Sequence, residues 1–322
     1  MKELTIEITI GEHKFYNAAD IQIERSWSFL SDTATVVLSR LLFPKGSVKN
    51  ASGEVTNNKI KVGDPISIRL GYDYVFQTEF EGYIKVIKPN SPVTLECEDA
   101  MWLLKQTNYT QSWRKVSLSQ LLDFIIPKSM TYETFGEVNL GKMRLDKVSA
   151  YDVLKKIDET YKLVSYFKEN KLYVGFPYQQ EAKRTRVEMQ RHVDDEKTTL
   201  SYRTADQVKL KFKAISIQKD GSKIEVELGD EDGQLRTMHL PIGLSKAEIK
   251  RVAEEQKKLF TFDGYDGSIV TFGQPVIHHS DVVEIVNWDY PDRTGAYRVD
   301  TVQVSCGAEG YRRTLTLGNK VE

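Results

Sequence analysis

The densest group of possible metal ligands lies in the last fifty residues, where the adjacent histidines His278 and His279 precede Asp281. Imidazole and carboxylate groups are common zinc ligands. Adjacent residues of a strand, however, point to opposite faces of its sheet, so the two rings do not readily share one ion. We therefore expect no metal centre here and place the two histidines in a turn before a strand that Asp281 opens.

A short acidic segment, Asp230-Glu231-Asp232-Gly233, is similar to the start of a calcium-binding loop. Such a loop needs a bidentate glutamate at its twelfth position. Counted from Asp230, that position is Pro241. The segment therefore predicts a tight turn and no calcium site.

Three neighbouring carboxylates, Glu96, Glu98 and Asp99, are the best candidates for acid–base chemistry. Glu96 and Glu98 share one face of a predicted strand, and nothing in the sequence supplies an opposed carboxylate across a cleft, as polysaccharide hydrolysis requires. We expect a solvated strand face, with Asp99 capping the helix that follows. The GxSxG, HExxH, GxGxxG and P-loop patterns are also missing. We predict no catalytic residues, no cofactor and no enzyme.

Two features are candidates for an interface or a channel surface. Lys209, Lys211 and Lys213 alternate with apolar residues and form a stripe on one side of a predicted strand. The simpler interpretation is a solubilising edge strand; the alternative is a face that lines a pore or pairs with an acidic subunit. Trp288 and Tyr290 lie in a loop, where aromatic residues serve sugar stacking or protein docking, and we favour docking.

Composition limits the class of protein. The 322 residues are 40% hydrophobic and 28% charged, which suits a soluble globular chain with two or three cores. The 45 basic and 46 acidic residues leave a formal net charge of −1, which disfavours a DNA-coating or membrane-surface protein. Cys97 and Cys306 form neither a zinc pattern nor a disulfide framework. No apolar stretch has the length of a bilayer span, and we expect synthesis in a reducing cytoplasm.

Alternating apolar residues dominate the first 98 positions, as at Ile66, Ile68 and Leu70. A period of two predicts half-buried strands. Turn-forming glycine, proline and asparagine residues separate these strands at spacings typical of a small barrel or sandwich. Residues 43–58 are polar and form either an inserted loop or a docking element.

Helical spacing replaces this alternation in the middle of the chain. Ser117 with Gln120, and Ser149 with Asp152, are capping pairs that predict helix starts. The other elements predicted in this part are a short helix at residues 100–105 and a strand pair at residues 163–167 and 171–176. Together they indicate a small α/β domain followed by a charged connector.

Alternation returns near residue 208, and residues 229–233 predict a hairpin turn. A capping box of Ser245 and Glu248 starts one helix within this second β region. The predicted fold class is therefore mainly β with an α+β insertion. The predicted domains are residues 1–99, a first β-barrel; residues 100–198, an α/β domain with its connector, joined by an inserted helix within residues 241–266; and residues 199–240 with 267–322, a second β-barrel.

The two β regions share an order of parts: an Asp-led strand, a Gly-led strand and a closing Thr-Leu strand. The first set covers residues 63–70, 80–86 and 93–97, and the second covers residues 280–286, 294–299 and 313–318. Such self-similarity indicates a duplicated unit. Three copies of a chain with two similar barrels can close into a ring of near-sixfold character.

Several short stretches carry a family resemblance. They are Gly63-Asp64-Pro65-Ile66-Ser67-Ile68, Phe80-Glu81-Gly82-Tyr83-Ile84, Thr94-Leu95-Glu96-Cys97-Glu98-Asp99, Gly295-Ala296-Tyr297-Arg298-Val299-Asp300 and Gly310-Tyr311-Arg312-Arg313-Thr314-Leu315. In these stretches, and in the order of its elements, the chain resembles the baseplate hub proteins of phage tails, the late control protein D group. The likeness covers most of the chain as an order of elements.

The resemblance implies a homotrimeric hub with two tube-like β-barrel domains per chain, arranged as a pseudo-hexameric ring. Its partners would be the tail tube protein on one face, the tail spike protein on the other and further baseplate proteins, with DNA or the tape-measure protein passing through the channel. The implied location is the virion tail of a phage or prophage, assembled in the bacterial host cytoplasm. Related hubs occur in contractile injection and secretion devices. The family has no catalytic residues to carry over.

Two other functions remain open from the residues. A carbohydrate-binding or adhesive β-protein would use the chain's 16 tyrosines and 4 tryptophans. A polysaccharide hydrolase would gather its carboxylates from distant loops. Saturable glycan binding by a monomer favours the first, and turnover that is lost on substitution of one acid such as Glu98 favours the second.

Overall fold

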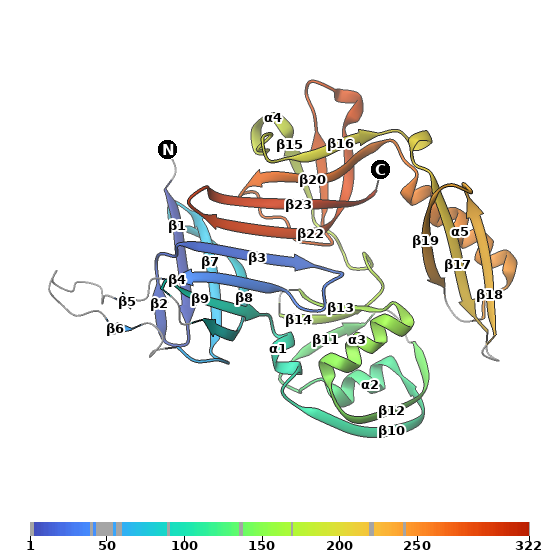
Figure 1. The fold of residues 1–322 in the computed structure, drawn as a ribbon, viewed down its shortest axis with the longest axis horizontal. Coiled ribbons are helices and arrows are strands. Elements are labelled where there is room, and N and C mark those ends of the chain that lie inside the picture. Colours follow the sequence, from blue (N-terminus) through green and yellow to red (C-terminus); the bar gives the residue numbers. More distant parts are fainter. Residues whose placement is uncertain are drawn as a thin grey trace. The chain divides into compact units, whose positions relative to one another are not determined.

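The structure, a computed structural model, describes residues 3–38, 41–42, 54–55, 60–88, 91–134, 138–168, 170–218, 222–240 and 243–321. Strands hold 55% of the residues and a few small helices hold 16%, which confirms the predicted mainly β fold (Figure 1). Of the predicted loop at residues 43–58, all but Glu54 and Val55 lies outside the described residues. None of the helices in the described part of the chain combines the length and apolar character needed to cross a lipid bilayer.

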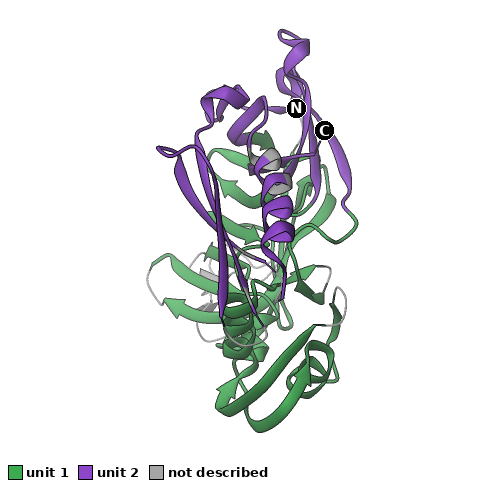
Figure 2. Ribbon diagram, turned by 90° about the vertical axis from the view of Figure 1, so that its right-hand side faces the viewer, with its two compact units in different colours: residues 1–181, 270–280, 300–315 green, residues 182–269, 281–299, 316–322 purple. Residues whose placement is uncertain are grey.

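The chain divides into two compact units, each built from segments that are distant in sequence (Figure 2). The first unit contains residues 1–181, 270–280 and 300–315, and the second contains residues 182–269, 281–299 and 316–322. Strands β20 (Gly264–Phe272), β22 (Gly295–Gly307) and β23 (Gly310–Lys320) contribute one part to each unit. Neither unit is therefore a continuous stretch of sequence.

The main sheet of the first unit combines N-terminal strands with parts of two strands from the last fifty residues of the chain. Its strands are β1 (Leu4–Ile10), β2 (His13–Phe15), β3 (Asp20–Ser26), β4 (Thr33–Leu38), β7 (Pro65–Tyr72), β8 (Val75–Lys88) and β9 (Val93–Glu98), with the first-unit parts of β22 and β23. Their order is β23-β22-β3-β4-β9-β8-β7-β1-β2. Ile66, Ile68 and Leu70 of β7 are fully buried, as their alternation predicts. The short strands β5 (Leu41–Leu42) and β6 (Glu54–Val55) pair with each other.

The α/β part of the first unit follows β9. Its elements are α1 (Met101–Leu104), β10 (Asn108–Ser117), α2 (Leu118–Ile125), β11 (Thr131–Thr134), β12 (Asn139–Ser149), α3 (Ala150–Tyr161), β13 (Val164–Lys168) and β14 (Lys171–Gly175). They form an antiparallel β10–β12 pair and a β11–β14–β13 sheet (Figure 1). Leu121 and Leu122 of α2 and Leu154 of α3 are buried in one shared core.

Both predicted capping pairs in this part are present. The Ser117 hydroxyl accepts a hydrogen bond from the Gln120 backbone N–H, and the Gln120 side chain accepts one from the Ser117 N–H, which closes a capping box. The Ser149 hydroxyl accepts from the Asp152 N–H at the start of α3. These bonds satisfy backbone donors that have no partner inside a helix. The sequence signal and the observed helix starts therefore coincide.

The second unit contains two sheets. Its elements are β15 (Arg184–Glu188), α4 (Met189–His192), β16 (Thr199–Arg203), a 3-10 turn (Ala205–Gln207), β17 (Leu210–Ile217), β18 (Lys223–Gly229), β19 (Gln234–Leu240), α5 (Lys246–Phe260), β21 (Val282–Val286), a 3-10 turn (Pro291–Arg293) and the remaining parts of β20, β22 and β23. One sheet has the order β16-β20-β23-β22-β21-β15, and the other has the order β18-β17-β19. Helix α5 covers one face of the smaller sheet, where Ala214, Val226, Ile249 and Ala253 form its core.

The predicted hairpin at residues 229–233 is wrong. Strands β18 and β19 do not pair with each other, because β17 lies between them, antiparallel to β18 and parallel to β19. The connection instead passes around the start of β17, with Asp230 N–H bonded to the Leu210 carbonyl. At Gly229, where φ is +110°, a Cβ atom would stand 2.1 Å from the Leu210 oxygen, so the turn residues serve this close approach.

The predicted role of the inserted helix also differs from the structure. Helix α5 begins at the predicted capping box of Ser245 and Glu248. It packs on β17 and β18 in the second unit, whereas the helices of the 100–178 part belong to the first unit. Its apolar face is used by the adjoining small sheet. Closure of either large sheet into a barrel stays a prediction, since the pairings among described strands run in open orders.

The shared order of parts that indicates a duplicated unit corresponds to two similar strand orders in the structure. β7, β8 and β9 are consecutive neighbours in their sheet, and β21, β22 and β23 are consecutive neighbours in the same way. Each triplet thus follows a simple meander, in which the middle strand of the sequence is also the middle strand in space. Common descent of the two triplets stays a prediction.

Candidate functional site

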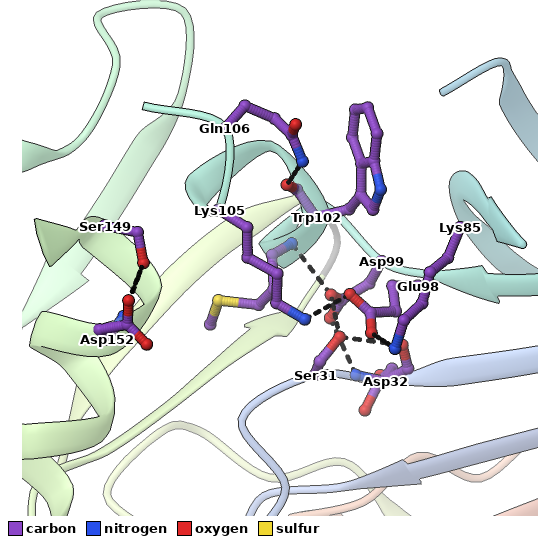
Figure 3. Close-up of polar contacts among 11 residues, drawn as sticks. Ser31, Asp32, Lys85, Glu98, Asp99, Trp102, Lys105, Gln106, Ser149 and Asp152 are labelled. Carbon is purple, nitrogen blue, oxygen red and sulfur yellow. Dashed lines mark hydrogen bonds and ion pairs between the residues drawn. The ribbon is translucent and has the colours of Figure 1, made fainter. Parts of the chain in front are cut away.

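The predicted carboxylate group lies where β9 leads into α1 (Figure 3). Glu98 is only 4% exposed, so the prediction that it belongs to a solvated face is wrong. Its Oε1 atom is 2.5 Å from the Nζ atom of Lys85, and its Oε2 atom is 2.5 Å from the Nζ atom of Lys105. Burial opposes ionisation of Glu98, but the hydrogen bonds and charges of Lys105 and Lys85 prevail and lower its pKa.

Asp99 has the capping role that the sequence predicts, although helix α1 starts one residue later than expected. Its Oδ1 atom accepts hydrogen bonds from the Met101 N–H and the Ser31 hydroxyl, both at 3.0 Å. Its Oδ2 atom accepts one from the Asp32 N–H at 3.1 Å (Figure 3). One carboxylate thereby ties the turn before β4 to the start of α1.

Asp32 is a second buried acid beside Asp99. It is 7% exposed and accepts a hydrogen bond from the Ser26 N–H at 3.3 Å. Burial, and then the charge of Asp99, raise the pKa of Asp32 well above its usual range. Burial likewise raises the pKa of Asp99 to about 6, against the hydrogen bonds that it accepts. Two acids of raised pKa are typical of functional sites, but they also occur in structural networks.

Both acids line a cavity of about 380 Å³ within the first unit. The His278 and His279 side chains line it too, and Arg25 lies with its Nη1 atom 3.2 Å from Nδ1 of His278. Burial, and then the charge of Arg25, lower the pKa of His279 to about 3, so this ring is neutral at physiological pH. Among the described residues, no three His, Cys, Asp or Glu side chains are grouped to hold a metal ion.

A buried charged cluster that the sequence analysis missed joins β8 to β23 within the first unit. Glu79 and Arg313 are both 0% exposed, with Oε1 of Glu79 2.8 Å from Nη2 of Arg313. The Tyr311 hydroxyl donates to the same carboxylate oxygen at 2.5 Å. Burial, and then the charge of Glu79, raise the pKa of Tyr311. Arg313 also donates to the carbonyls of Ile277 and Gly273.

The geometry of this cluster is that of a buried ion pair with a structural role. Its charges are fully enclosed and bonded to one another and to backbone carbonyls, so no solvent-facing group is left for a substrate. Arg313 lies on the same face of its strand as Tyr311 and the apolar Leu315, and this spacing of two was the available signal that Arg313 faces inward. Glu79 gave no such signal, because it sits at a register shift between Phe80 and Thr78 that turns it inward.

The predicted lysine stripe is present in the second unit and is matched by acids. Lys211 lies 3.1 Å from Glu227, Lys213 lies 2.7 Å from Glu225, and Lys209 lies 3.2 Å from Asp232. Each pair is partly exposed, so each contributes little to stability. Leu210 and Phe212, on the other side of the strand, are buried. The stripe carries little uncompensated positive charge.

Trp288 and Tyr290 lie together in the loop after β21, with 51% and 50% of their surface exposed. The Asn287 side chain accepts hydrogen bonds from the backbone N–H groups of Asp289 and Tyr290, which fixes the loop. The Arg293 guanidinium lies over the Tyr290 ring at 4.1 Å. Exposed Trp288 and Tyr290, with the half-buried Arg293 against one ring, have the composition of an interface centre.

Comparisons with known proteins were made from sequence and from structure. No protein-family model matches the sequence, and no curated protein matches it. Among solved structures, the 43 kDa tail protein of prophage MuSo2 from Shewanella oneidensis has a TM-score of 0.63 at 13% identity, covering 98% of this chain and 97% of that chain. A tail protein from Neisseria meningitidis has a TM-score of 0.63 at 13% identity, covering 99% and 97%.

A third similar structure is the c3393 protein of E. coli, a component of the type VI secretion system that exhibits structural similarity to the T4 bacteriophage tail proteins gp27 and gp5. Its TM-score is 0.62 at 9% identity, and the match covers 98% of this chain and 77% of that chain. The chain therefore has the fold of these tail and secretion-system proteins. The resemblance to the baseplate hub proteins is confirmed at the level of the fold.

Proposed function

We propose that the chain is a structural hub of a phage or prophage tail, a homotrimer whose pseudo-hexameric ring joins the tail tube to the spike. The observation that carries this proposal is the shared fold along nearly the whole chain, with 97% of each of two tail proteins covered in return. The location that follows is the virion tail or baseplate, with assembly in the host cytoplasm.

The proposed mechanism is recognition by complementary surfaces, without bond making or breaking. The braced loop with Trp288 and Tyr290 is the proposed contact with a neighbouring chain, a tube subunit or a spike. Lys209, Lys211 and Lys213 are the proposed lining or subunit-pairing face, which the observed acid partners make nearly neutral. A nearly neutral lining suits passage of DNA or a tape-measure protein, because strong charge would hold a charged polymer in place.

Native mass spectrometry of the chain tests the proposal, alone and mixed with the tube and spike proteins encoded beside it. We expect a trimer of 36.9-kDa chains, about 111 kDa, at least when the spike protein is present. Trp288→Ser combined with Tyr290→Ser should weaken the complex about tenfold or more. Tyr74→Ser, at a turn residue 69% exposed in the first unit, is the matched control and should leave it unchanged.

Two results contradict the proposal. Only monomers in every mixture, including mixtures with both neighbours, would exclude the ring. Saturable binding of glycans by the monomer, lost in the Trp288 and Tyr290 variant, would favour the carbohydrate-binding alternative instead.

A further inference from the structure

A groove runs between β12 and α3 in the first unit. It holds a cavity of about 310 Å³. Met143 and Val148 from β12, with Val153 and Ile157 from α3, give it an apolar lining. Met143 and Val148 are only half-buried, so part of this apolar surface stays in contact with water. Such a hollow is a suitable receptor for an apolar side chain from another molecule.

The backbone edge of β12 borders the same groove. Among the described strands, β12 pairs with β10 alone, so its second edge has no neighbouring strand. The Leu140 carbonyl accepts a hydrogen bond from the Tyr161 hydroxyl at 2.7 Å, and Tyr161 is the last residue of α3. This bond places the start of β12 beside the end of α3, next to the groove. An open edge with unpaired N–H and C=O groups is a template for an added strand.

The dimensions fit a short extended segment. α3 has 12 residues, and at a rise of about 1.5 Å per residue it is about 18 Å long. An extended chain rises about 3.3 Å per residue, so five or six residues span the groove.

The charge around the groove is positive. Lys142, Arg144 and Lys156 line it and are exposed, and among the described lining residues Asp152 alone is acidic. Asp152 is occupied at the cap of α3, where its Oδ2 atom accepts a hydrogen bond from the Ser149 hydroxyl at 2.6 Å. Arg144 has a 3.8 Å ion pair with Asp146, but both side chains are well exposed, so this pair neutralises little.

We propose that this groove binds an extended acidic segment of a partner protein, which adds a strand to the open edge of β12 and places apolar side chains in the cavity. The backbone edge supplies affinity that is independent of sequence. The three cations select for acidic residues in alternate positions, and the cavity selects for an apolar residue between them. The inference does not depend on ring assembly, since every participating residue belongs to one chain.

Fluorescence anisotropy with the full chain tests the proposal. The probe is a fluorescein-labelled ten-residue peptide that alternates glutamate with valine. We expect saturable binding that weakens as salt is raised, because exposed charges are screened. Lys142→Glu combined with Lys156→Glu should weaken binding about tenfold or more. The matched control is Lys155→Glu, an exposed lysine of α3 that does not line the groove, which should leave binding within about twofold.

Two further peptides test the strand pairing itself. One carries N-methyl groups on its valines and the other on its glutamates. Because alternate amides of a strand point to opposite edges, one version should lose binding and the other should keep it. Binding by both versions would overturn the edge pairing.

Other results would also overturn the proposal. Equal binding of a peptide with lysine in place of glutamate would show that charge plays no part. An equal loss in the Lys155 variant would show that the groove is not the site. If the chain associates with itself through β12, the β12 amides are protected from hydrogen exchange. If the peptide does not reverse this protection, a second copy of the chain is the occupant of the groove. Circular dichroism of each variant establishes that it is folded.

Discussion

Removing one member of the Glu79–Arg313 pair should be among the most destabilising single changes in the first unit. Arg313→Met deletes the guanidinium and leaves the Glu79 carboxylate at 0% exposure, where the Tyr311 hydroxyl is the remaining hydrogen-bond donor to Oε1 among the described residues. A buried charge without its counter-charge lowers stability by about 3–5 kcal/mol. Glu79→Gln leaves the Arg313 guanidinium buried without a counter-charge and should lower stability by a similar amount.

The double variant, Glu79→Gln with Arg313→Met, should be more stable than either single variant. It carries no buried charge, and the glutamine oxygen still accepts from the Tyr311 hydroxyl. The native pair is also imperfect, since Oε2 of Glu79 and Nε of Arg313 have no hydrogen-bond partner within the described chain. Replacing a whole buried pair by neutral groups is often close to neutral in stability. We expect the double variant to lose about 1–2 kcal/mol, mostly from the unpaired carbonyls of Ile277 and Gly273.

Urea denaturation followed by circular dichroism measures these differences. At a slope of about 3 kcal/mol per molar urea, the single variants should lower the midpoint by about 1–1.7 M. Arg312→Met is the matched control, because Arg312 is the next residue on the strand and is only half-buried; it should lower stability by less than about 1 kcal/mol. A single variant within the range of this control, or a double variant that loses the sum of the two singles, would refute the reasoning.

Two further changes test the acids near α1. Asp32 and Asp99 bind protons more tightly in the folded chain than in the unfolded chain, so together they make stability fall as pH rises from about 4 to above 6. Asp32→Asn should reduce this fall between pH values of about 4.5 and 7.5. Buried His279 has the opposite effect on stability over this range, but the effect is the same in the wild type and the variant. If the urea midpoint changes between the two pH values by the same amount in both proteins, the prediction is wrong. Glu98→Gln should lower stability by about 2 kcal/mol, and Glu96→Gln, at a more exposed residue, should lower it by less than about 0.5 kcal/mol. Neither variant nor the wild type should turn over peptidoglycan. Turnover by the wild type that is lost only in the Glu98 variant would favour the hydrolase alternative.

Local patterns predicted the elements whose physics is local. The period of two placed Ile66, Ile68 and Leu70 in a core strand, since successive side chains of a strand face opposite sides. The Ser117 and Ser149 caps predicted the starts of α2 and α3, because a side-chain oxygen at the N-cap accepts a hydrogen bond from a backbone N–H up to three residues later that has no partner inside the helix. In these cases the residues that decide the structure are neighbours in sequence.

Features that depend on distant partners could not be predicted in this way. In the order β18-β17-β19, β17 lies between two strands that follow it in the sequence. The turn residues 229–233 suit a direct hairpin between β18 and β19 equally well, so they do not reveal that β17 separates them. Glu98 lies at the end of an alternating strand. Its burial depends on the charges of Lys85 from β8 and Lys105, the residue that follows α1. Strand β12 has few buried positions, so its apolar alternation is too weak to predict its groove.

The polar groups that look most like catalytic machinery are already bound within the chain. Glu98 is held by two lysines, and Asp99 accepts three hydrogen bonds. A carboxylate whose charge is paired and whose oxygens already accept hydrogen bonds must break those bonds before it can act on a substrate. For a buried ion pair this costs about 3–5 kcal/mol, which opposes catalysis. The Trp288 and Tyr290 loop and the β12–α3 groove instead keep open surface that a partner can cover without breaking internal bonds. Variants of the buried acids should therefore change stability first, and variants of these two surfaces should change binding while stability stays the same.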